Sequence, residues 1–215
     1  TRGMMAGART ETPWQAEGDE KRSAVQRMFG DIAPTYDLLN SMMSLRLHHR
    51  WRRFAVAQLG LKPGARVLDV CCGTGDFMLP LRDAVGAHGV VVGVDFCLPM
   101  LEVAVQKQAP GPVSLGDACR LPVASASLDG ASVGWGIRNV PDIDAAHREL
   151  ARVLKPGARF VSLDMARPDF VPVRWVSDLL FRKGVPLMGR AFGKSEAYTY
   201  LPESTQRFLG RAELA

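Results

Sequence analysis

The chain has 215 residues, a mass of 23.4 kDa and a formal net charge of +5, and 47% of its residues are hydrophobic. This length is enough for one α/β domain with a sizeable core, and the composition is typical of a globular protein. Because no run of about 18 apolar residues is present, the sequence predicts no membrane-spanning helix, and we expect a cytoplasmic location.

The N-terminal quarter of the chain has a helical pattern. Residues 1–18 lack the apolar stretch of a secretory signal, and we interpret them as a flexible leader. Residues 19–60 follow as a helical region, whose first helix is predicted to end near Gly30 and Pro34. A second, amphipathic helix is predicted to end at Gly60 and to carry on one face Leu47, Trp51, Phe54, Ala55 and Leu59.

Residues 61–166 alternate between β-branched runs and helical patterns. Strands are predicted at 66–70, 90–95, 112–117, 128–136 and 158–165, with helices at 77–85, 98–108 and 142–154, the last of them closed by a turn at 155–157. Such alternation forms a parallel sheet with helices on both faces. We therefore predict a doubly wound, mainly parallel α/β fold, followed by a helical cap at 167–215.

The first strand ends in a turn, "VLDVCCGTGD", that contains two glycines and two adjacent cysteines. Gly73 and Gly75 would let the backbone approach a ligand closely; the alternative is that they only make a tight turn. Four cysteines, at 71, 72, 97 and 119, lack the spacing of a metal or redox set. We expect reduced, buried thiols and no metal.

The charges beside this turn favour a cationic ligand. A dinucleotide fingerprint needs a third glycine where this chain has Met78, which argues against an NAD-dependent dehydrogenase. Asp76 at the start of the following helix would repel a pyrophosphate. Together with Asp69 at the strand end, it supplies negative charge that suits an ammonium and a sulfonium.

Acidic residues also follow the next two strands. Asp95 lies about 20 residues after the second glycine, where an acidic side chain binds ribose hydroxyls. Asp117 and the backbone N–H of Ala118 are expected to contact an adenine. S-adenosylmethionine fits all of these positions.

The chain resembles a known family in several motifs. "VLDVCCGTGD", "VVGVDFCLPML", "GDACRLP", "GWGIRNV" and "RVLKPG" occur in the order found in class I methyltransferases that C-methylate the ring of ubiquinone and menaquinone precursors. "FGDIAPTYDLLNSMMSLRLHHRWRR" and "SEAYTYLPES" are similar to the flanking signatures of that family. The likeness runs from about Lys21 to Glu203, and "GIRNV" with "YTYLPES" is specific to this family.

The resemblance implies a Rossmann-like fold and contacts to S-adenosylmethionine from Thr74, Asp95, Asp117 and Ala118. Gly134 stands where many members have serine, so a contact there would come from the backbone. Family members continue into a further helix and two antiparallel strands, and we expect five strands in this chain with those terminal strands missing.

The resemblance also implies the reaction. It is C-methylation of a demethylmenaquinol ring in the last step of menaquinone biosynthesis; the alternatives are a benzoquinol or other small-molecule substrate, and a noncatalytic subunit that binds S-adenosylmethionine. Arg138 would stabilise the phenolate and Asn139 orient it, unless Arg138 instead pairs with Asp164. Water or His48 would take the phenol proton. Candidates for the substrate pocket are Tyr36, Asp37, Asp164, Tyr198 and Tyr200.

The basic and aromatic stretch "RLHHRWRRF" (46–54) favours contact with anionic headgroups at the inner face of the membrane, where a prenylated quinol resides. The alternative is a solvated helix face that packs Trp51 and Phe54 inward. A nucleic-acid partner is not expected, because no RNA-binding module is visible. A homodimer is compatible with the sequence.

Overall fold

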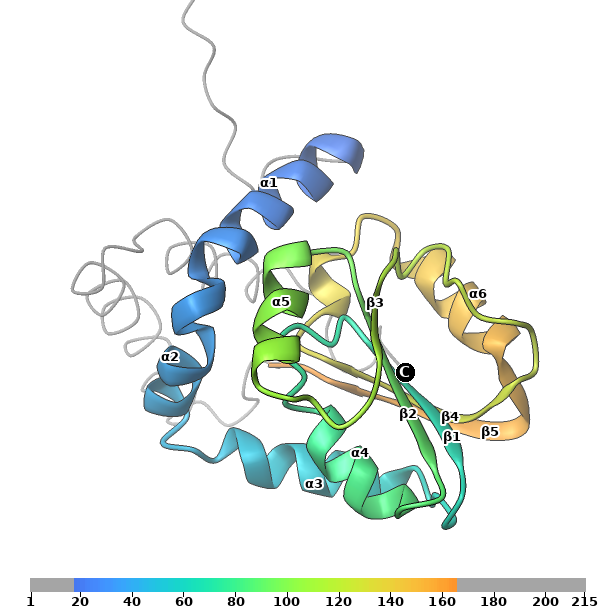
Figure 1. Cartoon of the computed structure of the whole chain (residues 1–215). Coiled ribbons are helices and arrows are strands. Elements are labelled where there is room, and N and C mark those ends of the chain that lie inside the picture. The colour runs from blue at the N-terminus through green and yellow to red at the C-terminus, as the bar shows by residue number, and fades with distance from the viewer. Residues whose placement is uncertain (1–17, 166–215) are drawn as a thin grey trace, which may run out of the picture.

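The structure is a computed structural model that describes residues 18–165, and Figure 1 shows a sheet flanked by helices. Five parallel strands lie in the order β3-β2-β1-β4-β5. They are β1 (Arg66–Val70), β2 (Val90–Asp95), β3 (Val113–Leu115), β4 (Leu128–Gly134) and β5 (Leu154–Leu163). The order reverses between β1 and β4, so this sheet has the switch point at which open α/β sheets bind ligands.

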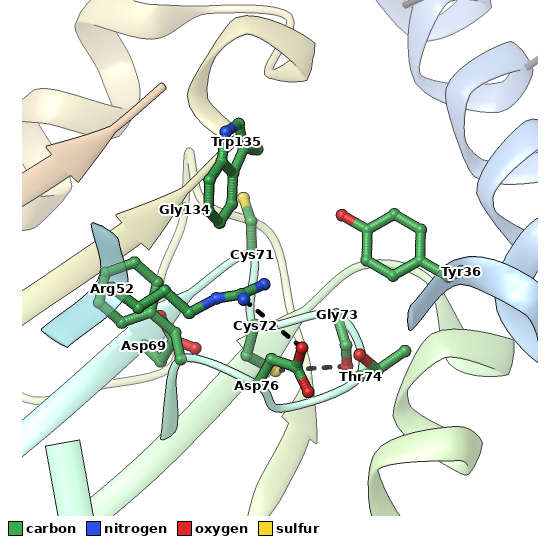
Figure 2. A pocket seen from close by; sticks show the side chains of 11 residues that line it. Tyr36, Arg52, Asp69, Cys71, Cys72, Gly73, Thr74, Asp76, Gly134 and Trp135 are labelled. Atoms are coloured by element: carbon green, nitrogen blue, oxygen red, sulfur yellow. Dashed lines mark hydrogen bonds and ion pairs between the residues drawn. The ribbon is translucent and has the colours of Figure 1, made fainter. Parts of the chain in front are cut away.

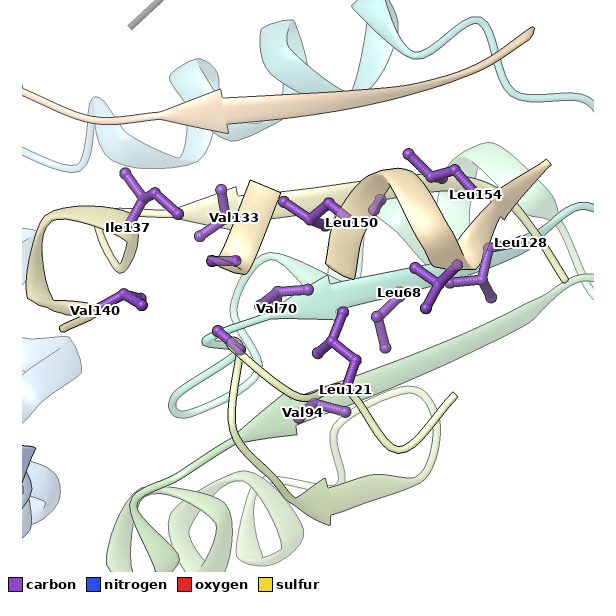
Figure 3. Close-up of a cluster of buried hydrophobic side chains, with 14 residues drawn as sticks. Leu68, Val70, Val94, Leu121, Leu128, Val133, Ile137, Val140, Leu150 and Leu154 are labelled. Carbon is purple, nitrogen blue, oxygen red and sulfur yellow. The ribbon is translucent and has the colours of Figure 1, made fainter. Parts of the chain in front are cut away.

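One face of the sheet is covered by α6 (Ile143–Val153). Figure 3 shows its Leu150 among buried side chains of the central strands, Leu68 and Val70 of β1 and Val133 of β4. Side chains alternate along a strand, so Val67 and Asp69 point to the opposite face. Asp69 is therefore directed away from the α6 layer.

The opposite face is covered by α3 (His48–Gln58) and α4 (Met78–Val85). Their buried side chains pack with Val67 of β1 and Val91 of β2. The remaining core helix, α5 (Leu98–Gln106), packs on β2 and β3. The predicted doubly wound parallel sheet is thereby confirmed.

The first N-terminal helix ends where the sequence predicts, and the chain continues directly into further helical turns. α1 spans Gly18–Ile32, so it ends between Gly30 and Pro34, and it leads through a 3-10 turn, Ala33–Thr35, into α2 (Tyr36–Met43). Pro34 does not break the path because it stands in the first turn of the short 3-10 helix, where no N–H is needed. Figure 1 shows α1 and α2 beside α5.

The buried face of α3 also differs from the prediction. Trp51 and Phe54 are 43% and 70% exposed, so the interpretation that they pack inward is wrong. Ala55 and Leu59 are buried as predicted, and His48, Arg52 and Val56 are buried with them. Two polar side chains are accommodated on this face because Arg52 hydrogen-bonds to His48.

The last strand begins earlier than predicted. β5 starts at Leu154 and includes residues 155–157, which we expected to form a separate turn. Leu128 of β4 pairs with Leu154, but Gly130 pairs with Arg159, so β5 bulges out between these pairs. Gly157 has φ +80°, a conformation that suits glycine within this bulge.

Several expectations concern segments beyond the described residues. The leader at 1–18, apart from Gly18, and the cap at 167–215 lie outside them, as does the place where further strands would follow. Within the described part, no helix is long and apolar enough to cross a membrane.

All four cysteines are free thiols, as predicted; Cys72 and Cys97 are buried, whereas Cys71 and Cys119 are half-buried. Burial raises the pKa of the Cys71 and Cys72 thiols. Both therefore remain protonated near neutral pH.

The α6 layer gives a direct test of the core. Leu150→Ala should lower the free energy of unfolding by about 2–5 kcal/mol, because the leucine is 1% exposed and its removal leaves a cavity. The matched control is Leu79→Ala in α4, whose side chain is 50% exposed and whose loss should cost less than about 0.5 kcal/mol. Urea unfolding of both variants measures the difference; equal losses would contradict the assigned packing.

Candidate functional site

A pocket lies at the carboxyl end of β1, beside the switch point of the sheet. Figure 2 shows its walls, which come from the N-terminal helices, the turn after β1 and the end of β4. Six residues predicted from the sequence line it: Tyr36, Asp69, Gly73, Thr74, Asp76 and Gly134. Arg52 lines it too, although it was not among the residues predicted for the site.

The turn after β1 is fixed by the carboxylate of Asp95 at the end of β2. The backbone N–H of Gly73 donates to Oδ2 at 2.9 Å, and that of Cys97 donates to Oδ1 at 2.8 Å. Burial raises the pKa of Asp95, although these N–H groups oppose the shift. Each oxygen keeps a second lone pair, so the carboxylate still has acceptor capacity for a ribose hydroxyl.

The two glycines of the turn have positive φ, +52° at Gly73 and +83° at Gly75. A Cβ on Gly75 would lie 2.9 Å from the Cβ of Ala109, and one on Gly73 would lie 3.2 Å from Met100 Cε. Both positions therefore need glycine for backbone conformation and packing, and the predicted close approach of this backbone to a ligand stays a prediction.

Asp69 is the acidic side chain at the centre of this site. It is 1% exposed, and its Oδ1 accepts a hydrogen bond from Ser132 Oγ at 2.7 Å, across the strand pair. Oδ2 is buried and has no hydrogen-bond partner. Burial raises the pKa of Asp69 to about 7. A cation in the pocket would satisfy Oδ2 and favour the ionised carboxylate.

A second set of charges joins the turn to α2 and α5. Lys107 pairs with both Asp37 and Asp76, and Thr74 Oγ1 donates to Asp37 Oδ1 at 2.6 Å. Burial opposes ionisation of Asp76, but Lys107 and Arg52 outweigh it and lower its pKa. Asp76 is therefore ionised near neutral pH, as predicted, although cations of the protein already face it.

Arg52 enters the pocket from α3. Its Nη1 lies 3.5 Å from Asp76 Oδ2, and its guanidinium carbon lies 4.8 Å from the ring centroid of Trp135. The side chain is 6% exposed and its Nε has no partner. The sequence contained one signal for this placement: Arg52 shares the helical face of Ala55, Val56 and Leu59, which are buried.

His48 is buried beneath Arg52. Its Nδ1 faces Arg52 Nη1 and its Nε2 lies 3.2 Å from Ser41 Oγ, so Nδ1 accepts and Nε2 carries the proton. Burial and the neighbouring Arg52 lower its pKa to about 4, so the ring is neutral. His48 does not line the pocket, and its predicted role as base stays a prediction.

His48 also lies in the one group of side chains in the described part that could hold a metal ion. Ligand atoms of His48, His49 and Asp76 lie within 4.8 Å of one another. The Arg52 guanidinium contacts His48 and Asp76, and its positive charge disfavours a second cation there.

The residues predicted to contact adenine lie farther along the same edge, after β3. Asp117 Oδ1 accepts from the N–H of Cys119 at 2.9 Å, and Oδ2 pairs with Arg22 of α1. Ala118 is buried. These residues do not line the pocket, but they follow the strand beyond Asp95, as the sequence predicted.

The GIRNV motif follows β4 as a 3-10 turn, Ile137–Asn139. Arg138 pairs with Asp164 at the end of β5, and both side chains are almost fully buried. The pairing considered from the sequence therefore exists. Burial raises the pKa of Asp164, while Arg138 opposes the shift. Asn139 donates to the carbonyl of Trp135 at 3.2 Å, which holds the turn beside the pocket.

Of the remaining predicted residues, some line the pocket and others lie outside the described part of the chain. Gly134 lines the pocket, where a Cβ would lie 2.6 Å from a ring carbon of Phe77, so the aromatic ring occupies the space that a side chain at 134 would need. Burial raises the pKa of Tyr36, which lines the opposite wall. Tyr198 and Tyr200 lie outside the described residues.

Solved structures share this fold. The YcgJ protein from Bacillus subtilis aligns with a TM-score of 0.52 and 28% identity, over 63% of this chain and 58% of that one. An S-adenosylmethionine-dependent methyltransferase from Thermotoga maritima aligns with a TM-score of 0.59 and 24% identity, over 87% of this chain and 75% of that one. The predicted Rossmann-like fold is thereby confirmed.

Curated relatives match nearly the whole chain. The demethylmenaquinone methyltransferase of Desulfitobacterium hafniense is 43% identical over 205 residues, which are 92% of this chain and 81% of that protein. That of Staphylococcus aureus is 40% identical over 203 residues, covering 93% and 84%.

The model of the ubiE/COQ5 methyltransferase family matches residues 15–215. The predicted methyltransferase class, with S-adenosylmethionine as cofactor, is confirmed by this match and these relatives. The chain belongs to the ubiE/COQ5 methyltransferase family.

Proposed function

We propose that this chain transfers the methyl group of S-adenosylmethionine to a ring carbon of a demethylmenaquinol, the last step of menaquinone biosynthesis. The relatives named demethylmenaquinone methyltransferase support this substrate. The observation that carries the cofactor assignment is the unpartnered, buried carboxylate oxygen of Asp69 in a pocket at the switch point. A buried acceptor without a partner costs free energy unless a ligand satisfies it.

In this proposal the cofactor extends along the carboxyl edge of the sheet. Asp69 holds the ammonium, the spare lone pairs of Asp95 accept from the ribose hydroxyls, and Asp117 with Ala118 contacts the adenine. Asp117 also pairs with Arg22, so its carboxylate must accept from both Arg22 and the adenine. Thr74 and the Gly73 backbone line the same pocket.

When bound, S-adenosylmethionine would supply a methyl group on a sulfonium: the bond to ring carbon forms as the bond to sulfur breaks, and the ring carbon then loses its proton to solvent as the ring regains aromaticity. Ring carbon is a poor nucleophile until its neighbouring hydroxyl is deprotonated. We assign phenolate stabilisation to Arg138, which Asp164 holds in place, and orientation to Asn139. Because the pKa of His48 is about 4, we assign the proton to water.

The direct test of function is methyl transfer in vitro. Purified protein with labelled S-adenosylmethionine should methylate a short-tailed demethylmenaquinol and release S-adenosylhomocysteine in equal amount, measured by mass spectrometry. A benzoquinol of matched tail length serves as the competing substrate. Faster methylation of the benzoquinol would contradict the naphthoquinol assignment. Absence of methyl transfer to either substrate would contradict the proposed quinol methyltransferase activity.

Asp69 predicts how cofactor affinity varies with pH. Because a cationic ligand favours the ionised carboxylate, affinity should rise roughly tenfold per pH unit up to about pH 7 and then level off. Asp69→Asn should bind more weakly and without this dependence, whereas Asp83→Asn, an exposed residue of α4, should behave like wild type. Calorimetry between pH 5.5 and about 8 would contradict the assignment if wild type and Asp69→Asn had parallel profiles.

The same pKa has a consequence for stability without ligand. An ordinary Asp has a pKa of 3.8, so between that value and about 7 the folded protein binds a proton that the unfolded chain releases. Ionisation of Asp69 in the folded protein therefore costs stability as pH rises, and this cost is greatest above about pH 7. The free energy of unfolding of Asp69→Asn should increase relative to that of wild type as pH rises through this window.

Arg138 predicts a catalytic defect that is separate from binding. Removal of one charge-stabilising donor typically costs about 10²–10³-fold in kcat. Arg138→Ala would also leave Asp164 buried and unpaired, so the more informative variant combines Arg138→Gln with Asp164→Asn, which keeps the shape without the charges. Its turnover should fall by about 100-fold or more while affinity for S-adenosylmethionine is kept.

Arg148→Gln, an exposed arginine of α6, is the matched control and should leave turnover unchanged. A folded Arg138→Gln/Asp164→Asn protein with wild-type turnover would show that the pair is structural only.

We further propose that the start of α3 contacts anionic headgroups on the inner face of the cytoplasmic membrane. The α3 surface consists of the exposed residues Leu45, Leu47, Trp51 and Phe54 with Arg46, Arg50 and Arg53. Positions 47, 51 and 54 share one helical face, and the arginines form a neighbouring row. Apolar and cationic side chains in this arrangement complement anionic headgroups. A homodimer stays a prediction.

Vesicle sedimentation tests the α3 surface. Wild type should bind phosphatidylglycerol-containing vesicles, release them at high salt, and bind pure phosphatidylcholine weakly. Trp51→Ser with Phe54→Ser should weaken binding severalfold, whereas Val105→Ser, equally apolar and 63% exposed on α5, should not. Binding that is unaffected by both salt and the double variant would contradict the proposal.

A further inference from the structure

We propose that Arg52 binds the α-carboxylate of the methionine end of S-adenosylmethionine. The inference deepens the proposed function and rests on it, because it concerns the same cofactor. Its basis is a pair of unpartnered buried atoms of opposite charge, Arg52 Nε and Asp69 Oδ2, whose side chains both line one pocket. Figure 2 shows the guanidinium of Arg52 reaching into this pocket between Trp135 and Asp76.

The Arg52 guanidinium has one edge that is free to bind a ligand. Nη1 contacts His48 and Asp76, whereas Nε, on the other side of the group, has no partner. An Nε edge presents parallel N–H donors that match a carboxylate. A buried N–H without an acceptor is unfavourable, and an anionic ligand that accepts from it would remove this cost.

The charge of Arg52 is also incompletely neutralised. Asp76 is its only ion-pair partner among the described residues, and Asp76 lies closer to Lys107, at 2.7 Å, than to Arg52, at 3.5 Å. His48 accepts a hydrogen bond from Arg52 but contributes no negative charge. The pocket therefore offers a positive centre to a ligand in addition to the acidic centre at Asp69.

A zwitterion satisfies both centres at once. An α-amino acid carries ammonium and carboxylate on one carbon atom, whereas a phenolate would leave Asp69 unsatisfied. The contacts with Trp135 and His48 fix the guanidinium in place, so little side-chain entropy is lost when a carboxylate binds. Arg52 and Asp69 would thus set both the position and the direction of the methionine end.

The experiment compares two cofactors that differ only in this carboxylate. Calorimetry with S-adenosylmethionine and with decarboxylated S-adenosylmethionine is carried out on wild type, Arg52→Gln, Arg52→Lys and Arg27→Gln. Wild type should prefer the carboxylated form by about 10- to 100-fold, the range for a charge-assisted hydrogen bond. Arg52→Gln should lose this preference through weaker binding of the carboxylated form alone. Arg52→Lys should recover part of it, and the exposed Arg27 should not matter.

The outcomes separate this inference from the proposed function. If Arg52→Gln weakens both cofactors equally, or neither, Arg52 is not the carboxylate partner and the inference is overturned. If Arg52→Gln keeps cofactor affinity but raises the KM for the quinol, Arg52 faces the substrate instead, which also overturns it. If wild type binds neither cofactor, the proposed function itself fails. Thermal unfolding of each variant identifies any that do not fold.

Discussion

The carboxylate of Asp95 is the contact on which the geometry of the cofactor edge depends. It accepts one N–H from the turn after β1 and another from the start of α5, so a single side chain fixes two loops that follow neighbouring strands. The turn needs such a tie because Cys71, Gly73 and Gly75 all have positive φ. With the turn held, Asp69 and Thr74 line the same pocket.

The N-terminal helices complete the site through polar contacts, and of these helices α3 also packs in the core on the sheet. Arg52 reaches Asp76, Thr74 donates to Asp37, and Arg22 pairs with Asp117. Apolar packing of α1 against α5 supports them in small separate clusters. The charges that surround the proposed cofactor therefore come from two layers of the molecule, and loss of the helical layer would remove the cationic half of the site while leaving Asp69 in place.

Local sequence patterns predicted the strands best where only one secondary structure fitted the pattern. β1 and β2 begin and end at the predicted residues because β-branched runs are bounded by turn residues. β5 was wrong at its start because residues 155–157 resemble a turn, and only pairing with β4 shows that they lie in a bulge. The prediction of the buried face of α3 was wrong for a related reason. The pattern favours burial of the apolar Trp51 over the charged Arg52, and only a partner such as His48 makes burial of the arginine favourable.

The carboxylates at the strand ends were predictable because topology alone brings such residues to one edge of a parallel sheet. The pairing of Arg138 with Asp164 could be considered from the sequence only as one alternative, because it depends on tertiary contacts. The helical pattern places Arg52 on a buried face, but its contacts with His48 and Asp76 also depend on the tertiary structure. The most direct test of the central claim, that this pocket receives the amino-acid end of the cofactor, is a crystal structure with S-adenosylhomocysteine. We expect its ammonium at Asp69, its carboxylate at Arg52 and its adenine near Asp117. A homocysteine end outside this pocket, or directed towards Asp117, would contradict the claim.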